Sequence, residues 1–315
     1  MRRRHRHTSG SGRATKPLRL RLQLGVHTGL MNAAITTRDD IRRVLIAGDA
    51  HGNTAWVETL TRKAAERSCP IIIQVGDFGY FPDRPWGPRF LTSVDTACRD
   101  SGVELWFIDG NHDDHFALAQ HRESATPVAL TDRVAYIPRG ARMTLGNRAF
   151  GFLGGAFSVD WRDRTQGLDW WASERTDRAD VARLGDGRLD ILITHEAPTG
   201  IEFSARRLPA EDQVRTDEVR ALIAETVEAT LPRLTLHGHW HHAHDTELSW
   251  IDRVATERTG ALTWQSTRVI GLNCDGDPND GWLVLDLATL DVDWPTACAH
   301  PIGRDSAEDA VEVES

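Results

Sequence analysis

The stretch Val44-Leu45-Ile46-Ala47-Gly48-Asp49-Ala50-His51 decides the fold of this chain of 315 residues. A short apolar run rich in β-branched residues predicts a buried strand, and here the run leads into an Asp-x-His pair. Open α/β folds build their sites from side chains in the loops at the carboxyl ends of strands. Other apolar runs that lead into polar residues occupy 71–75, 105–108 and Ile191–Thr194, and a weaker one occupies 234–236. We therefore expect five strand ends that together carry one site.

Five short pieces follow these runs and hold the candidate site residues. They are Asp49-Ala50-His51, Gly76-Asp77, Gly110-Asn111-His112-Asp113, His195 and Gly238-His239-Trp240-His241. The set supplies three carboxylates, one amide and five imidazoles, enough to hold two divalent metal ions. Imidazoles favour transition metals over Mg²⁺, so Mn²⁺, Fe²⁺ or Fe³⁺, or Zn²⁺ is expected. Two such cations can promote phosphoester hydrolysis by neutralising the phosphate oxygens and stabilising the leaving oxygen.

The spacing within the pieces fits ligands of shared ions. In Asp49-x-His51, alternate residues of an extended segment point to one side and can reach the same ion. His239-x-His241 repeats that arrangement, and Asp77 follows the second strand as the natural bridge between two ions. Each piece alone is weak evidence, because an isolated Asp-x-His is usually coincidence. Five pieces in order, each at a strand end, point to a metal site.

In order, the five pieces resemble the signature of the calcineurin-like metallophosphoesterase superfamily: Asp-x-His, Gly-Asp, Gly-Asn-His-Asp/Glu, His and Gly-His-x-His. The match spans residues 48–241 and is specific for the superfamily but not for a branch within it. It implies an α/β fold, namely a four-layer αββα sandwich of two mixed β-sheets flanked by helices. It also implies two sets of metal ligands. One ion takes Asp49, His51, Asp77 and His241, and the other takes Asp77, Asn111, His195 and His239.

The same resemblance implies the catalytic roles. A water or hydroxide that bridges the two ions is the implied nucleophile. His112 is implied as the general acid or as a cation that binds the phosphate. Asp113 is implied as the residue that orients His112 or its loop.

One branch of the superfamily fits poorly. Ser/Thr protein phosphatases have Gly-Asp-x-Val-Asp-Arg-Gly in the second block and an arginine directly before Gly-Asn-His-Glu. Here the second block reads Gly76-Asp77-Phe78-Gly79-Tyr80-Phe81, and Asp109 occupies the place of that arginine. A protein phosphatase is therefore disfavoured, and a compact phosphatase or phosphodiesterase is expected.

Residues outside the ligand set are candidate substrate contacts. Arg162 is a candidate phosphate-binding cation, and His242 is a candidate substrate contact. Trp170-Trp171 can stack a nucleobase, although packing of an inserted helix explains the pair equally well. Residues 275–279 have a faint likeness to a calcium loop but lack its central glycine, so we expect a plain turn there.

Composition separates a basic head and an acidic tail from one folded domain. Residues 1–30 hold seven arginines and one lysine without an acid, which leaves 29 basic and 46 acidic residues in the rest of the chain. We expect a basic, disordered leader over 1–40, a single metallophosphoesterase domain over 41–300 and a flexible acidic tail over 301–315. A body this acidic argues against a nucleic-acid partner.

The sequence also bears on cellular location. No apolar run approaches the roughly 18 residues that a membrane-spanning helix needs, and no secretory signal is evident. The four cysteines lie far apart without a Cys-x-x-Cys motif, which favours reduced thiols. We therefore expect a cytoplasmic protein without a membrane partner.

Periodicity and turn signals predict mixed βαβ and hairpin connections after residue 41. Helices are expected at 54–67, 89–100, 169–183 and 216–231. Further strands are expected at 134–137, 141–145, Arg148–Leu153, 262–272 and 282–287.

These features predict a metal-dependent phosphoric ester hydrolase, a phosphatase or phosphodiesterase for a small phosphorylated or nucleotide-like substrate. One alternative is a binding module on the same fold that lacks catalysis, although the complete ligand set argues against it. Another is a nuclease that binds the phosphates of a nucleic acid with its basic head, which predicts that its activity depends steeply on salt concentration. The choice between monoester and diester and the oligomeric state stay open at this level.

Overall fold

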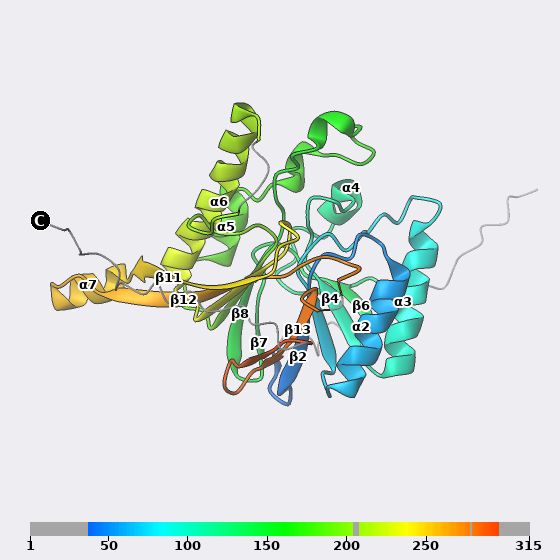
Figure 1. The fold of residues 1–315 in the computed structure, drawn as a ribbon, viewed down its shortest axis with the longest axis horizontal. Coiled ribbons are helices and arrows are strands. Elements are labelled where there is room, and N and C mark those ends of the chain that lie inside the picture. Colours follow the sequence, from blue (N-terminus) through cyan, green and yellow to red (C-terminus); the bar gives the residue numbers. More distant parts are fainter. Residues whose placement is uncertain (1–36, 204–207, 278, 296–315) are drawn as a thin grey trace, which may run out of the picture.

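The structure, a computed structural model, describes residues 37–203, 208–277 and 279–295 and contains two seven-stranded mixed sheets (Figure 1). Sheet B has the order β14 (Val292–Asp293), β13 (Trp282–Asp286), β2 (Arg43–Ala47), β3 (Ile71–Gln74), β4 (Glu104–Phe107), β6 (Val134–Tyr136), β5 (Val128–Ala129). Sheet A has the order β1 (Thr37–Arg38), β7 (Arg142–Leu145), β8 (Arg148–Leu153), β9 (Ile191–Thr194), β10 (Leu234–His237), β12 (Trp264–Gly271), β11 (His244–Ile251).

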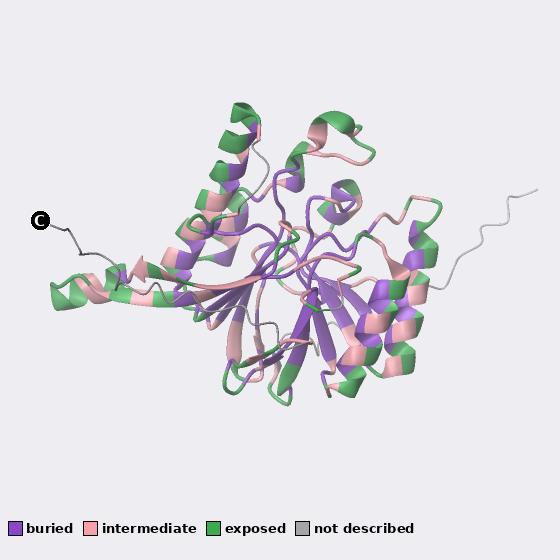
Figure 2. Ribbon diagram, viewed as in Figure 1, coloured by how far each residue is buried: buried purple, intermediate pink, exposed green. Residues whose placement is uncertain are grey.

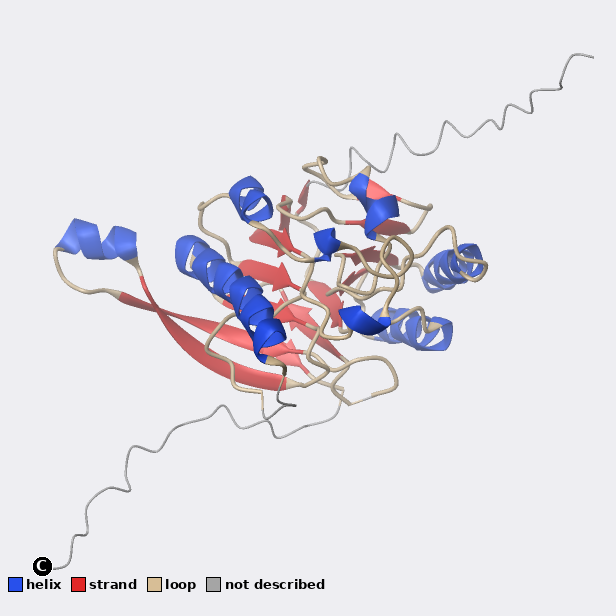
Figure 3. Cartoon of the chain, turned by 90° about the horizontal axis from the view of Figure 1, so that it is seen from above, coloured by secondary structure: helices blue, strands red, loops and turns tan. Residues whose placement is uncertain are grey.

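Helices cover the outer face of each sheet (Figure 3). The helices on sheet B are α2 (Thr54–Glu66) and α3 (Gly87–Ser101), and those on sheet A are α5 (Arg178–Leu184) and α6 (Ala210–Thr230). Shorter helices lie in the connections: α4 (His115–Ala119), η1 (Trp161–Asp163), η2 (Ala172–Glu174) and α7 (Arg253–Thr259).

Alternating side chains place the layers in order. On β2, Val44 and Ile46 lie in the core between the two sheets, whereas Leu45 lies in the core beneath α2 and α3. On β9, Ile193 lies in the core between the sheets, and Leu192 packs with residues of α5 and α6. The central strands of both sheets are therefore buried on both faces and purple in Figure 2, which explains their nearly continuous apolar runs, whereas β11 and the first half of β12 are largely half-buried or exposed. The expected αββα sandwich is confirmed.

Most of the expected strands and helices form at or within a few residues of their expected positions, but the prediction of one helix was wrong. The expected helix over 169–183 forms only as η2 and, after a break, α5. The reason is a capping box: the Asp177 side chain accepts hydrogen bonds from the backbone N–H groups of Ala179 and Asp180, so a new helix begins there.

The ends of the chain bear on the expected domain limits. The described structure begins at residue 37, inside the range 1–40 expected for the leader. There β1 pairs in parallel with β7, so its two residues belong to sheet A. The basic head over 1–30 and the acidic tail over 301–315 lie outside the described residues. Within the described ranges, no helix combines the length and apolarity required to cross a membrane.

Candidate metal centre

The candidate ligands converge because the strands that precede them are parallel. In sheet B, β2, β3 and β4 run in parallel and lead into Asp49, Asp77 and Asn111. In sheet A, β9 and β10 run in parallel and lead into His195 and the 238–241 loop. The carboxyl ends of parallel strands share one edge of a sheet, so both sheets deliver ligands to the same end of the sandwich.

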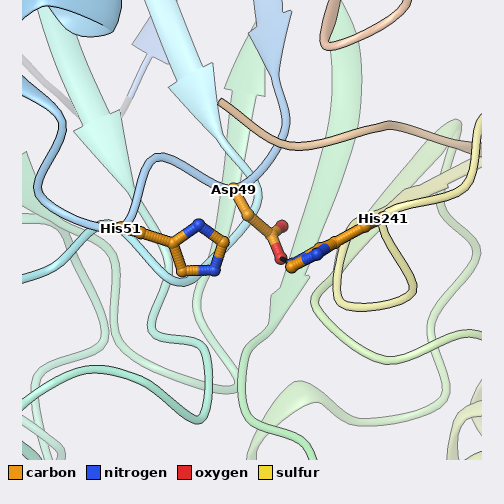
Figure 4. Close-up of side chains that lie close together, drawn as sticks. All are labelled: Asp49, His51 and His241. Carbon is orange, nitrogen blue, oxygen red and sulfur yellow. Dashed lines mark hydrogen bonds and ion pairs between the residues drawn. The ribbon is translucent and has the colours of Figure 1, made fainter. Parts of the chain in front are cut away.

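The first group of close ligand atoms comes from Asp49, His51 and His241 (Figure 4). Their ligand atoms all lie within 4.8 Å of one another. The Asp49 carboxylate lies between the two rings, with its Oδ2 3.0 Å from His241 Nε2. The ring centroids of His51 and His241 are 5.0 Å apart. These atoms can surround one cation.

The second group comes from Asp49, Asp77 and His195, whose ligand atoms also lie within 4.8 Å of one another. His195 Nε2 is 3.4 Å from Asp77 Oδ1 and 3.1 Å from the side-chain oxygen of Asn111. The other Asp77 oxygen, Oδ2, is 3.6 Å from His51 Nε2. Asp49 is the residue common to the two groups, and Asp77 approaches His195 with one oxygen and His51 with the other.

His239 belongs to neither group of close ligand atoms but lies next to both. Its backbone N–H donates to both carboxylate oxygens of Asp49, at 3.2 Å each. Its ring centroid is 5.1 Å from that of His195, and its Nε2 is 3.6 Å from Glu196 Oε2. The Nδ1 atom is therefore the nitrogen of His239 left for a cation.

His112 and Asp113, the expected catalytic pair, take different positions. The His112 side chain is 37% exposed, and its ring centroid is 6.1 Å from that of His51, so the ring borders the ligand groups and reaches solvent. Its backbone N–H donates to Asp77 Oδ1 at 2.6 Å. Asp113 is fully buried and accepts hydrogen bonds from the backbone N–H groups of Gly79, Tyr80 and Gly110, at 2.8 Å each. Asp113 thus fixes the two ligand loops.

The two candidate substrate contacts belong to neither group of close ligand atoms. Arg162 forms ion pairs with Asp212 and Glu211, and His242 is an exposed residue of the 238–242 loop. Arg164 is the arginine nearer the site: its guanidinium donates to the Asn111 carbonyl oxygen at 3.1 Å and to Ser158 Oγ. Contacts of Arg162 and His242 with a substrate stay predictions.

Local backbone geometry explains the residue types beside the ligands. Of the eight non-glycine residues with positive φ in the described chain, four are expected ligands: His51, Asp77, His239 and His241. Such strain clusters at functional sites. Gly76 has a φ of +107°, and a Cβ there would lie 2.3 Å from His195 Nδ1. A side chain at Gly76 would therefore displace a ligand.

The donor set fits divalent cations. Asp49 and Asp77 are 0% and 1% exposed, and no lysine or arginine pairs with either within the described ranges. Instead, each carboxylate meets imidazoles and backbone N–H groups. Buried carboxylates without a fixed positive partner are costly unless a cation or a proton neutralises them. Carboxylate, amide and imidazole donors together suit the transition metals expected from the sequence.

The histidine pKa values reflect this concentration of negative charge. Burial opposes a charge on His195, but Asp77 and Asp49 outweigh burial and raise the pKa of the ring to about 10. Burial likewise opposes a charge on His51, and Asp77 and Asp49 raise its pKa to about 9. For Asp113, burial and the nearby charge of Asp77 raise the pKa to about 7. The cluster of carboxylates attracts positive charge, which protons or metal ions can supply.

Two supporting residues were missed from the sequence. Asp275 lies in the turn after β12, where its Oδ1 is 2.9 Å from His51 Nδ1 and its Oδ2 accepts a 2.7 Å hydrogen bond from Asn53. Glu196 is fully buried directly after His195 and accepts a 2.6 Å hydrogen bond from Trp240 Nε1. Asp275 follows a strand, so the strand-end pattern that predicted the ligands could have found it. Carboxylates in such positions orient metal-binding histidines.

Comparisons with known proteins give limited information. No family model matches the chain, and no curated protein matches it. The solved structure of TT1561 from Thermus thermophilus is similar at 12% identity, over 81% of this chain and 98% of that one, with a TM-score of 0.47. A second solved chain is similar at 13% identity over the same shares, with a TM-score of 0.48. The chemistry of the site therefore follows from its own residues.

Proposed function

We propose that this chain is a metal-dependent phosphoric ester hydrolase of the calcineurin-like metallophosphoesterase superfamily. The observation that carries the proposal is the pair of buried carboxylates, Asp49 and Asp77, ringed by imidazoles and without a lysine or arginine partner among the described residues. A structural role would pair these carboxylates with arginine or lysine. Two cations would complete the site instead.

The assignment of ligands to the two cations is the one that the resemblance implies, and the two groups of close ligand atoms supply five of its residues. Asp49, His51, Asp77 and His241 would hold one ion, and Asp77, Asn111, His195 and His239 the other. When bound, two such cations neutralise phosphoryl oxygens and supply a nucleophile at neutral pH.

The residues of the chain orient the substrate and move protons. His112 borders the ligand groups with a solvent-accessible ring, so it can donate a proton to the leaving oxygen or bind a phosphate oxygen. Asp113 supports this position by holding the loop of His112 against the loop of Asp77 through backbone hydrogen bonds. Asp113 is in this proposal a positioning residue.

The charge of the chain bears on the class of substrate. We propose a small phosphorylated or nucleotide-like substrate, because the acidic body of the chain disfavours nucleic acid. A cytoplasmic location agrees with the free thiols of Cys69, Cys98 and Cys274.

The proposal is tested with purified protein, Mn²⁺, p-nitrophenyl phosphate and bis(p-nitrophenyl) phosphate. We expect hydrolysis of at least one ester and a loss of at least about a thousandfold in kcat/KM for Asp77→Ala, because both ions lose a ligand. Asp132→Ala, which removes an exposed carboxylate, is the matched control and should behave as wild type. A protein that purifies folded, binds no metal and hydrolyses neither ester would be a binding module instead.

A further inference from the structure

Trp86 lies in the connection between β3 and α3, at the end of the sandwich that carries the metal centre. Its side chain is 45% exposed, and the other exposed tryptophan of the described residues is Trp264. Trp86 also occupies the N-cap position of α3 but makes no side-chain hydrogen bond to the helix. A small polar residue there would cap the helix. Capping therefore does not explain a tryptophan at this position, and nearly half of its surface is left out of the core.

The indole of Trp86 reaches from α3 to the loop of the first ligands. A Cβ at Gly52, the residue directly after His51, would lie 3.2 Å from Cζ3 and 3.4 Å from Cη2 of Trp86. These two atoms belong to the end of the indole that is farthest from its own backbone. The tip of the side chain therefore lies within about 9 Å of the Cα atom of His51. Phe81 and Phe90 pack against the indole, at centroid distances of 5.6 and 6.3 Å, and support this direction.

The backbone beneath the indole is fixed relative to the ligands. Gly52 has a φ of +74°, and its missing side chain leaves room for the indole. The Gly52 N–H donates to the Phe78 carbonyl oxygen at 3.0 Å, and the His51 N–H donates to the Asp77 carbonyl oxygen at 2.8 Å. These bonds join the two ligand loops on which the tip of Trp86 rests.

Three imidazoles form the side of the metal centre that solvent reaches. The carboxylates of Asp49 and Asp77 are buried, whereas the side chains of His51, His112 and His241 are partly exposed. An ester whose phosphate is bound by these ligands therefore extends its organic part past the exposed rings. The indole next to His51 offers an exposed aromatic surface on this side.

The surroundings of the indole favour an uncharged ring. Arg84 is the arginine of the same connection, and its guanidinium lies over the Phe81 ring at 5.9 Å and donates to the Leu168 carbonyl oxygen at 2.6 Å. It is thus engaged within the protein. The indole presents an apolar face, and aromatic rings pack favourably on such a face.

We propose that Trp86 selects esters whose organic part carries an aromatic ring, which packs on the exposed indole while the phosphate lies at the metal centre. This inference rests on the proposed function, and it adds a substrate class and the residue that selects it. Trp86 contributes to the binding of the ester and takes no part in the transfer of protons.

Two inert phosphonates that differ only in the ring test the inference, by calorimetric titration of the Mn²⁺-loaded protein. We expect phenylphosphonate to bind at least about fivefold more tightly than methylphosphonate, because stacking on the indole adds to the affinity of the shared phosphonate. Trp86→Ala should bring this ratio towards one and leave the affinity for methylphosphonate unchanged. Trp264→Ala removes the exposed tryptophan of the β11–β12 hairpin and is the matched control, which should preserve the ratio.

Steady-state kinetics give a second readout. For phenyl phosphate, Trp86→Ala should raise KM at least about fivefold and change kcat by less than about twofold, because the ring is bound equally in the ground state and the transition state. For glycerol 2-phosphate, which has no ring, both constants should stay as in the wild-type protein. Equal changes for both esters would show a merely structural role and reject the assignment.

A phosphonate ratio near one in the wild-type protein, with p-nitrophenyl phosphate still hydrolysed, would overturn the inference and leave the proposed function intact. Should Trp86→Ala not fold, Trp86→Leu takes its place, since leucine keeps apolar volume but removes the ring. It should lower the ratio, and a ratio of wild-type size would reject the assignment. If neither phosphonate binds, the inference is rejected, and the hydrolysis of p-nitrophenyl phosphate decides the proposed function separately.

Discussion

Two groups of buried carboxylates in this molecule are neutralised in different ways. At the metal centre, Asp49 and Asp77 meet imidazoles and backbone N–H groups. Behind it, Asp109 accepts a 2.7 Å hydrogen bond from Nε of Arg139, whose side chain is 1% exposed. Arg139 also donates to the backbone carbonyls of Glu174 and Arg175, at 2.7 Å each, and reaches Asp180 at 3.3 Å. The second group carries its own cation, Arg139, whereas the charge of the first group is met by protonated imidazoles or, as we propose, by metal ions.

This difference separates function from structure. The negative charge of Asp109 is already balanced: burial works against ionisation, but Arg139 and His115 hold the pKa of Asp109 below its usual value. Asp109 stands directly before Gly110 and Asn111, where protein phosphatases carry an arginine. The pair of Asp109 and Arg139 supports the ligand loop that begins at Gly110.

Breaking the Arg139 network should have the largest effect on stability. Arg139→Met leaves Asp109 buried without its positive partner, so we expect a loss of about 3–5 kcal/mol in the free energy of unfolding. Urea denaturation followed by circular dichroism measures it. The loss should be equal with and without a chelator, because this network needs no metal. Arg89→Met, at an exposed position, serves as the control with a change within about 0.5 kcal/mol. A loss below about 1 kcal/mol for Arg139→Met would contradict the comparison.

Removing metal should act on the other group alone. Cations that bind the folded state stabilise it, by about 2.7 kcal/mol when their free concentration is 100 times the dissociation constant. We therefore expect a chelator to lower the Tm of the wild-type protein in a thermal melt. Asp77→Ala should melt at the same temperature with and without the chelator. A chelator effect of wild-type size in that variant would show that the cations bind elsewhere.

Glu196→Gln should weaken metal binding without removing a ligand. Glu196 Oε2 is 3.6 Å from His239 Nε2, and the loss of its charge loosens the orientation of that ring. Changes of this kind cost about 10- to 100-fold in metal affinity. Calorimetric titration with Mn²⁺ should show the weakening in one of two binding steps. Equal weakening of both steps, or of neither, would argue against a role specific to His239.

The smallest effect concerns pH in the metal-free protein. The pKa values of His195 and His51 are raised to about 10 and about 9, above the unfolded value near 6.5. Their contribution to stability is therefore complete below pH 6.5 and is lost as the pH rises through 9 to 10. In chelator, Tm should fall between about pH 7 and 9, and Asp77→Ala should flatten this slope. A Tm that rises over this interval would show that these rings are not protonated in the folded state.

The ends of the central strands were predictable, because both faces of these strands are buried. Continuous apolar runs mark such strands, and β9 and β8 begin and end where the sequence places them. The ligands follow from the same rule, since each comes directly after a run. Asp49, Asp77, Asn111 and His195 thus meet as expected.

The supporting residues were harder to predict, since their partners are distant in sequence. Asp275 meets His51 across 224 positions, and Arg139 meets Asp109 across 30. Neither contact leaves a periodic pattern. Strand β12 forms within the expected range 262–272, but its partner β11 and the helix α7 at the tip of their hairpin escaped prediction, because much of this hairpin is half-exposed and it projects from the body (Figure 3). Burial leaves an apolar pattern in the sequence. Exposed elements and contacts between distant residues leave no such pattern.

The ligands belong to two separate sheets, and this division has a mechanical consequence. Asp49, Asp77 and Asn111 are carried by sheet B, whereas His195 and His241 are carried by sheet A. Close-packed apolar side chains hold the two sheets together over most of their interface. A cation bound by both sets of ligands would add a bond between the layers at one end. Metal loading would then set the rigidity of the whole sandwich as well as its chemistry.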